Sequence, residues 1–282
     1  MAQASTFNLN GTFYSTDQIM SAYNRGLHFG DSVFESILVI NGMVQLWEQH
    51  YARLLQGAAT LGFDFQPWWT EDYFKFEIRK SVKENKLSSA RVKLSLFRED
   101  GTRYTPNTDK ASYLIMMESL ESEPYALKPE GLQAGIFEDI LKPINALSGF
   151  KNGNSLLYVL AGRKARNEAW GTILLLNEKG QVCESGNGNV FLFRDGVVST
   201  PSIESGCVAG VMRLHLIQLM QQAGWKVEER EIPKSELDMA DEIWTCNASG
   251  GIQYVNTCGL RQYKNEKVLE LHQLLISQIQ TL

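Results

Sequence analysis

A lysine and a glutamate able to take part in cofactor chemistry lie in two glycine-rich segments of the second half of the chain. Lys151 lies in residues 148–154, read as SGFKNGN, and Glu184 opens residues 184–191, read as ESGNGNVF, ahead of an apolar strand. A buried amine with cationic neighbours is driven toward its neutral form and can then form a Schiff base with an aldehyde. A lone carboxylate could meet a ring nitrogen of the same molecule. Together the segments indicate pyridoxal phosphate chemistry; the alternative is that both residues are solvated in ordinary loops.

A place for an anion is indicated by residues 209–213, where a glycine immediately precedes a run with helical periodicity. The backbone N–H groups of Val211 and Met212 would lie in the first turn of that helix, where they have no intrahelical acceptor. Such amides, aided by the helix dipole, can bind a phosphate group. A glycine before a helix is also common without any ligand.

The pattern that continues from Glu184 is long and specific. Residues 184–191 read Glu-x-small-x-x-Asn-Val-Phe, residues 198–201 read Val-x-Thr-Pro, and residues 208–213 read Val-x-Gly-Val-x-Arg. This pattern resembles the signature of the class IV aminotransferases, which are the fold type IV pyridoxal phosphate enzymes. The resemblance covers nearly the whole chain, from about residue 24 to about residue 252.

The resemblance implies roles for individual residues. Lys151 would hold the cofactor and then move the proton from the substrate's α-carbon, while Glu184 would bind the ring nitrogen and keep it protonated. Arg53 matches the phosphate-binding arginine of the family. The loop that holds Ala248 and Ser249 matches the last phosphate contact, which we assign to Ser249. The family also implies a homodimer, in which the small domain of one subunit closes the active site of the other.

The residues that would select the substrate resemble different branches of the family. Residues 27–35 are closest to branched-chain aminotransferases, but Arg91 and Lys93 stand where those enzymes carry tyrosine and arginine. Phe34 replaces the tyrosine of D-amino acid aminotransferases. Arg103 stands where those enzymes hold a substrate carboxylate, without their nearby histidine.

A fifth candidate, His28, could bind a carboxylate in any of these enzymes. The spacing Lys151-x-x-Asn154 is more similar to aminodeoxychorismate lyases, which share the early chemistry but release pyruvate by elimination. The expected substrate-binding residues are His28, Phe34, Arg91, Lys93 and Arg103. The four of them that could bind a carboxylate could each instead be a solvated strand or loop residue, namely His28, Arg91, Lys93 and Arg103.

We therefore expect a pyridoxal phosphate-dependent aminotransferase that moves an amino group from a branched-chain-like or D-amino acid to a 2-oxo acid. The first alternative is a 4-amino-4-deoxychorismate lyase, which releases 4-aminobenzoate and pyruvate. The second is a cofactor-binding protein without catalysis. In each case the expected partners are small molecules and a second copy of the chain.

Composition supports a small-molecule enzyme. The chain has 282 residues, of which 44% are hydrophobic, and 27 basic against 32 acidic residues give a net charge of −5. The basic residues form no stripe of the kind that binds nucleic acid, and no apolar run is long enough to span a membrane. The four cysteines show no Cys-x-x-Cys spacing, so we expect reduced thiols in the cytoplasm, no zinc site and no secretion.

The periodicity of apolar residues predicts two domains of mixed α/β structure. Residues 33–40 and 43–46 read as a hairpin around Asn41-Gly42, and residues 48–61 read as an amphipathic helix with Arg53 on its less apolar side. We expect a small N-terminal α/β domain over residues 1–121. Residues 122–282 would form a larger cofactor-binding domain with a mixed, barrel-like sheet.

The other elements are expected by the same reasoning, and they alternate between strands and helices. Further strands are expected at residues 91–97, 112–117, 172–176, 189–193 and 242–246, and further helices at 72–84, 156–167 and 211–222. Asp195-Gly196 marks a second hairpin, so the sheet of the larger domain should be mixed rather than purely parallel.

Overall fold

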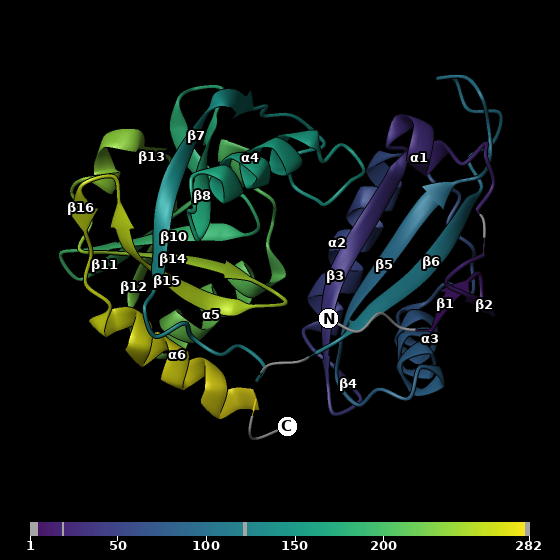
Figure 1. Ribbon diagram of the computed structural model, residues 1–282, viewed down its shortest axis with the longest axis horizontal. Helices are drawn as coiled ribbons and strands as arrows, with labels where there is room; N and C mark the ends of the chain where they lie inside the picture. The colour runs from purple at the N-terminus through teal and green to yellow at the C-terminus, as the bar shows by residue number, and fades with distance from the viewer. Residues whose placement is uncertain (1–4, 19, 121–122, 280–282) are drawn as a thin grey trace. The chain divides into compact units, whose positions relative to one another are not determined.

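The computed structural model describes residues 5–18, 20–120 and 123–279 and divides into two compact units (Figure 1). The first unit contains Met1–Pro124 together with Phe150–Asn154, and the second contains Tyr125–Gly149 and Ser155–Leu282. The five residues around Lys151 therefore belong to the first unit, although the chain on both sides of them belongs to the second. The domain boundary expected between residues 121 and 122 lies outside the described residues.

The first unit is built on a six-stranded antiparallel sheet with the strand order β2-β1-β6-β5-β3-β4. Its strands are β1 (Thr6–Leu9), β2 (Thr12–Ser15), β3 (Ser32–Ile40), β4 (Met43–Val44), β5 (Ala90–Arg98) and β6 (Ala111–Ser119). Its helices are α1 (Arg25–Phe29), α2 (Trp47–Thr60) and α3 (Glu71–Glu84). The expected hairpin at Asn41-Gly42 is confirmed, because β3 and β4 pair antiparallel across it.

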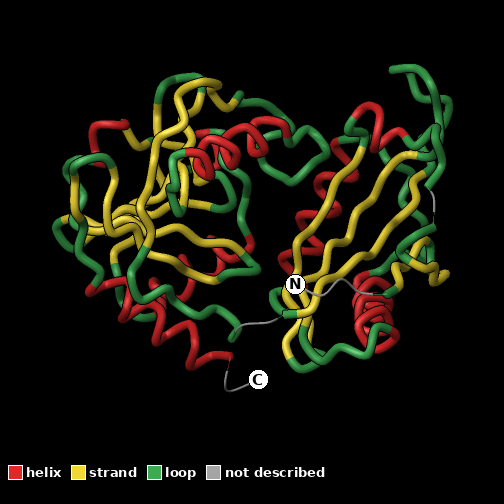
Figure 2. The backbone as a smooth tube through the Cα atoms, in the orientation of Figure 1, coloured by secondary structure: helices red, strands yellow, loops and turns green. Residues whose placement is uncertain are grey.

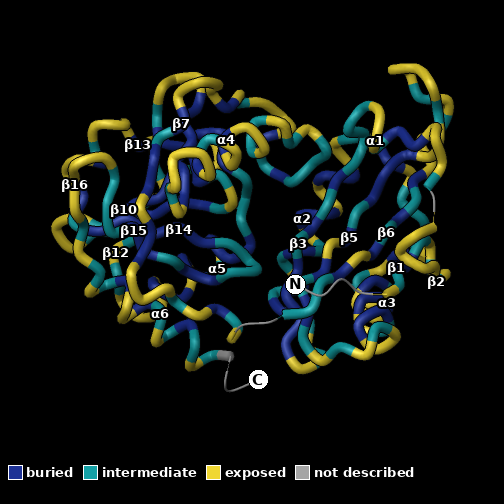
Figure 3. The backbone as a smooth tube through the Cα atoms, viewed as in Figure 1, coloured by how far each residue is buried: buried dark blue, intermediate teal, exposed yellow. Residues whose placement is uncertain are grey.

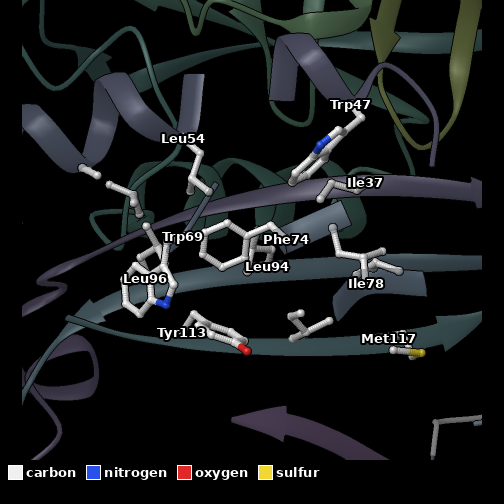
Figure 4. Close-up of a cluster of buried hydrophobic side chains, with 14 of the residues drawn as sticks. Ile37, Trp47, Leu54, Trp69, Phe74, Ile78, Leu94, Leu96, Tyr113 and Met117 are labelled. Atoms are coloured by element: carbon white, nitrogen blue, oxygen red, sulfur yellow. The ribbon is translucent and has the colours of Figure 1, made fainter. Parts of the chain in front are cut away.

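Alternation along β5 separates a buried face from a polar one, as the sequence predicts. Val92, Leu94 and Leu96 are fully buried, whereas Lys93 is exposed. The buried side chains pack with those of α2 and α3 in one core (Figure 4). The face that carries Arg91 and Lys93 is therefore turned away from the helices, because successive side chains of a strand point to opposite faces.

Helix α2 lies within one residue of its predicted bounds, but the prediction that Arg53 lies on its less apolar side was wrong. Arg53 is 6% exposed and shares the buried side of α2 with His50 and Leu54. The charge is tolerated there because Glu35 of β3 faces it, and buried charges require a partner.

The second unit is built on a ten-stranded mixed sheet whose main path runs β12-β11-β10-β14-β15-β7-β8-β9-β13, with β16 paired to β15. Its longer strands are β7 (Leu132–Lys142), β8 (Thr172–Asn177), β9 (Gln181–Ser185), β10 (Asn189–Arg194), β11 (Val197–Pro201), β12 (Lys226–Arg230), β14 (Glu242–Asn247) and β15 (Gly251–Cys258). Two short strands complete it, β13 (Ile232–Pro233) and β16 (Arg261–Gln262). The pairs β11/β12, β15/β7 and β7/β8 are parallel and the others antiparallel, which confirms a mixed, barrel-like sheet.

Helices flank this sheet (Figure 2). They are α4 (Leu156–Asn167), α5 (Val211–Gln222) and α6 (Glu266–Ile279), with two 3-10 turns, Ile203–Ser205 and Lys234–Leu237. The bounds of α4 and α5 agree with the predictions. Strands β8 and β14 are buried along almost their whole length, while exposed residues gather on loops and on outer helix faces (Figure 3).

Two further predictions concern the surroundings of the protein. None of the helices within the described residues is long and apolar enough to cross a membrane. All four cysteines carry free thiols, as expected. The location in the cytoplasm stays a prediction.

Candidate active site

The segment around Lys151 is held against the first half of β3 like a short additional strand. The backbone N–H of Phe34 donates to the carbonyl of Lys151 at 3.0 Å, and the N–H of Gly153 donates to the carbonyl of Ser32 at 2.9 Å. Paired backbone groups cannot shift without losing hydrogen bonds. The backbone of Lys151 is therefore fixed at an edge of the sheet in the first unit.

Two glycines allow this close packing. A Cβ atom on Gly153 would lie 2.5 Å from the carbonyl oxygen of Gly30, and one on Gly57 would lie 2.9 Å from the Phe150 ring. Both distances are shorter than real Cβ contacts. The glycine in α2 thus admits the residue that directly precedes Lys151.

Two lysine side chains lie over the same aromatic ring. The Nζ atom of Lys151 is 5.4 Å from the centre of the Phe34 ring, and the Nζ atom of Lys93 is 4.4 Å from it. The two amines are consequently no more than about 10 Å apart. The side chain of Lys93 is exposed as a whole, but partial desolvation of its amine lowers its pKa. The structure thus brings three of the expected site residues together.

Arg91 lies on the same sheet face as Lys93, two residues earlier on β5. A cavity of about 460 Å³ covers this part of the sheet. Its polar lining combines both cations with a carboxylate, and its apolar lining includes methionine side chains. Among the lining residues, Glu118 is opposite Arg91 in the sheet, and Ser36 and Met116 are opposite Lys93.

Arg53 belongs to a buried network with Glu35 and His50. Its Nε and one terminal nitrogen donate to the two oxygens of Glu35 at 2.8 and 2.6 Å, and Nδ1 of His50 lies 2.5 Å from Oε2 of Glu35. Burial raises the pKa of the Glu35 carboxyl. The Arg53 charge and the His50 hydrogen bond lower it, and the net result is a pKa lowered to about 2. Burial also lowers the pKa of His50. Within the described residues, Nε2 of His50 is buried and has no hydrogen-bond partner.

His28 and Arg103 are not gathered with the residues around Lys151. His28 is exposed on α1, and its Nε2 atom lies 2.6 Å from the carbonyl oxygen of Ala22. The side chain of Arg103 is exposed, and its backbone carbonyl accepts a hydrogen bond from buried Arg25. Their substrate-binding roles stay predictions.

Glu184 lies on strand β9 of the second unit and is 2% exposed, so the alternative of a solvated loop residue was wrong. Its Oε1 atom accepts from Nζ of Lys142 at 2.5 Å and from the Tyr158 hydroxyl at 2.6 Å. Its Oε2 atom accepts from the backbone N–H of Val208 at 2.8 Å. Burial lowers the pKa of Lys142, but the neighbouring groups, above all the charge of Glu184, together outweigh it, and the net shift is upward.

The start of α5 lies close to Glu184, because Val208, whose N–H donates to Glu184, is three residues before the first residue of α5. Val211 and Met212 occupy the first turn of α5 and are buried, and Gly210 is the N-cap without a side-chain cap. Asn189 donates to the carbonyl of Val208 at 2.8 Å, and a Cβ on Gly210 would lie 1.8 Å from its Oδ1 atom. Only glycine therefore fits beside Asn189 at this helix start.

Ser249 lies in the tight turn between β14 and β15. The side chain of Asn247 accepts from the backbone N–H groups of Ser249 and Gly250 at 3.0 and 2.7 Å. The strand before this turn pairs with β10, where Cys246 is opposite Asn189. The turn is thus linked through Asn189 to the start of α5.

Comparison with known proteins identifies the family. A sequence model of amino-transferase class IV matches residues 32–258. The chain belongs to the class IV aminotransferase family. Enzymes of this family depend on pyridoxal phosphate and act on small amino and keto acids.

Similar proteins differ in their reactions. The chain is 28% identical to an aminodeoxychorismate lyase of Vibrio harveyi, with 83% of this chain and 85% of the relative aligned. It is 25% identical to a D-alanine aminotransferase of Bacillus licheniformis, over 81% of this chain and 79% of the relative. The crystal structure of an Escherichia coli branched-chain amino acid aminotransferase superposes with a TM-score of 0.88 at 23% identity, covering 97% of this chain and 94% of that one. These likenesses support the family and the fold and leave the reaction to be proposed.

The residues present fit the cofactor of the family. A carboxylate offers about four lone-pair positions, and the donors to Glu184 use three of them, so a ring N–H can be received by the fourth. Arg53 carries five N–H groups and can serve both Glu35 and a phosphate. The buried Nε2 atom of His50 would find an acceptor in such an anion, which favours the charged imidazole.

No sequence motif singled out Glu35, His50, Lys142 or Tyr158. His50 and Arg53 are three residues apart on one helix, so they share a face, and two polar side chains on a buried face require a partner. That spacing could have indicated a buried carboxylate. Lys142 and Tyr158 carry no comparable local signal.

Proposed function

We propose that this protein is a pyridoxal phosphate-dependent aminotransferase that transfers the amino group of an amino acid to a 2-oxo acid. The observation that carries the proposal is the fixed position of Lys151, whose backbone is paired to β3 and whose amine lies over Phe34 beside Lys93. The bound cofactor would supply an aldehyde for the amine and a ring that withdraws electrons.

Each proposed role belongs to a group of this chain. Lys151 would hold the cofactor and carry a proton to and from the substrate's α-carbon. Glu184 would bind the pyridine nitrogen, and its buried charge would favour the protonated ring. Arg53 would bind phosphate oxygens through its guanidinium. The first amides of α5, at Val211 and Met212, would bind phosphate oxygens where the helix dipole favours negative charge.

The remaining proposed contacts are to the cofactor phosphate and to the substrate. Ser249 adds a hydroxyl to the phosphate site. Arg91 and Lys93 bind a substrate carboxylate from their shared sheet face, with Phe34 below the reacting amine. The small-molecule partners are an amino acid and a 2-oxo acid, and the active form is a homodimer.

The role of Lys151 is tested by reduction with borohydride in the presence of pyridoxal phosphate, followed by peptide mass spectrometry. A pyridoxyl group is expected on Lys151, and Lys151→Ala should lose both this label and all transamination. Lys93→Ala is the matched control, since it removes the other amine over Phe34 and should keep the label. A label on another lysine of the wild-type protein contradicts the proposal.

A lyase is the second candidate, because the chain is similar to an aminodeoxychorismate lyase and carries the spacing Lys151-x-x-Asn154. The two candidates separate in one experiment with a panel of L- and D-amino acids. A transaminase converts its cofactor to the aminated form when it receives a donor alone. A lyase instead forms 4-aminobenzoate and pyruvate from aminodeoxychorismate without a 2-oxo acid. Absence of any donor reaction together with pyruvate release replaces the first proposal by the second.

The homodimer is tested by light scattering coupled to gel filtration. The expected mass is twice that of the 31.8 kDa chain. A monomer that keeps full transaminase activity contradicts this part of the proposal.

A further inference from the structure

The ion pair between Lys142 and Glu184 is buried on all sides. The lysine, at the end of β7, and the glutamate, on β9, have side chains that are 5% and 2% exposed. Tyr158 of α4 donates to the same oxygen as Lys142, so Oε1 of Glu184 has two donors, while Oε2 has the N–H of Val208. The distribution of donors leaves one lone-pair position on Oε2 for a further N–H group.

We propose that Lys142 is a positioning residue for the cofactor, which keeps Glu184 ionised and turned so that Oε2 receives the pyridine nitrogen. This inference rests on the proposed function, in which Glu184 binds that nitrogen. The physical reason is that a buried carboxylate without a cation takes up a proton, and a protonated carboxyl no longer carries the negative charge that stabilises a protonated ring. Lys142 acts through Glu184 and does not itself touch the reacting atoms.

Lys142 is the titratable neighbour of Glu184 that carries a charge at neutral pH. The others are Tyr158 of α4, Cys183 of β9 and Cys207 before α5. Burial raises the pKa of Tyr158 and of Cys183 far above neutrality, and it raises the pKa of Cys207 to about 11. These three groups therefore stay neutral between pH 6 and 9, so the charge next to Glu184 depends on Lys142.

The experiment measures binding of pyridoxamine 5′-phosphate, which has no aldehyde and therefore does not need Lys151. Its dissociation constant is obtained from quenching of tryptophan fluorescence at several pH values between about 6 and 9, a range in which a buried acid can titrate. Each variant is expressed as a ratio to the wild type, because the ring nitrogen of the free ligand titrates equally in every experiment. The variants are Lys142→Met, Lys142→Gln and Lys142→Arg.

Loss of the charge should give a ratio that depends on pH. Lys142→Met and Lys142→Gln should bind about tenfold more weakly than the wild type near pH 6, and within about threefold near pH 9, where Glu184 ionises again. Lys142→Arg keeps the charge and should stay within about threefold at every pH. Lys142→Gln keeps a hydrogen-bond donor and supplies the neutral variant if Lys142→Met does not fold.

Lys164→Met is the matched control in the same unit. Lys164 also pairs with a carboxylate, that of Asp139 at 2.7 Å, and also lies over an aromatic ring, that of Phe137, but its side chain is 31% exposed. Its ratio should remain near one. A ratio independent of pH for both neutral variants, or Lys142→Arg binding as weakly as Lys142→Gln, overturns the inference. A wild-type protein that binds neither pyridoxamine phosphate nor pyridoxal phosphate overturns the proposed function instead.

Discussion

Glu35 in the first unit and Glu184 in the second are each buried in a network of donors, and these two networks are built differently. Glu35 receives its cation and its imidazole from a single helix, where His50 and Arg53 are one turn apart. Glu184 receives a lysine, a tyrosine hydroxyl and a backbone amide from three separate segments. Both networks balance one negative with one positive charge, as burial requires.

The difference lies in the group that each network leaves available. In the Glu35 network it is a nitrogen, Nε2 of His50, which is buried and has no hydrogen-bond partner among the described residues. In the Glu184 network it is a lone-pair position on the carboxylate. A protonated imidazole nitrogen can donate to an anion, and a carboxylate oxygen can accept from a protonated ring nitrogen. The first network can thus take a ligand atom that accepts a hydrogen bond, and the second can take one that donates.

The largest effect on stability is expected from Glu35→Gln. The change leaves Arg53 buried without its counter-charge, which typically costs about 3–5 kcal/mol of unfolding free energy. Urea denaturation measures the loss. Glu138→Gln is the matched control, because Glu138 also pairs with a cation, that of Lys234, but both side chains are exposed, and it should cost less than about 1 kcal/mol. Equal losses in the two variants would show that the buried network contributes little.

Dependence of stability on pH should distinguish the two networks. The Glu35 pKa is lowered from 4.5 to about 2, so its contribution of about 3 kcal/mol is present above pH 4.5 and lost as the pH falls toward 2. His50, whose pKa is lowered, adds a loss below its ordinary 6.5, because the unfolded chain takes up the proton first. Lys142, whose pKa is raised, contributes below its ordinary 10.5 and loses this contribution as the pH rises further.

Melting temperatures of two variants across the pH range test this assignment. Glu35→Gln should flatten the acid side of the profile and leave the alkaline side unchanged. Lys142→Met should remove the loss of stability above pH 10.5 that comes from Lys142 itself. An acid limb that Glu35→Gln retains in full would place the acid sensitivity elsewhere in the chain.

The next effect concerns the packing that fixes Lys151. Gly153→Ala would push a methyl group to 2.5 Å from the Gly30 carbonyl oxygen, and such overpacking typically costs about 1–3 kcal/mol. Borohydride labelling of Lys151 should slow as well, because the segment must move away from β3. Gly162→Ala is the control: nothing lies within 4 Å of the added atom in α4, and alanine favours a helix. Unchanged labelling in Gly153→Ala would show that the paired backbone does not position the amine.

The sequence predicted the elements whose signals are local. The periodic helices α4 and α5 and the hairpins at Asn41-Gly42 and Asp195-Gly196 depend on neighbouring residues, and the structure confirms them. Lys151 and Glu184 stood out because each lies in a continuous motif. The partners of Glu184 could not be found in the same way, since 42 residues separate it from Lys142 and 26 from Tyr158. The wrong side assigned to Arg53 has the same cause, because its burial depends on a carboxylate from another strand.

The smallest effect is expected from Tyr158→Phe, which removes one neutral donor from Glu184 and keeps its cation. A hydrogen bond to a charged group contributes about 1.5 kcal/mol, and the carboxylate would still be held by Lys142 and the Val208 amide. Because the charge next to Glu184 is unchanged, the affinity for pyridoxamine phosphate relative to the wild type should not vary with pH, unlike that of Lys142→Gln. Urea denaturation and the same fluorescence titration measure both quantities. A ratio of dissociation constants, variant over wild type, that rises toward low pH would show that the hydroxyl rather than the ammonium keeps Glu184 ionised, because only removal of the ionising group should let that carboxylate take up a proton. A loss of stability above about 3 kcal/mol would contradict the expected size of the effect.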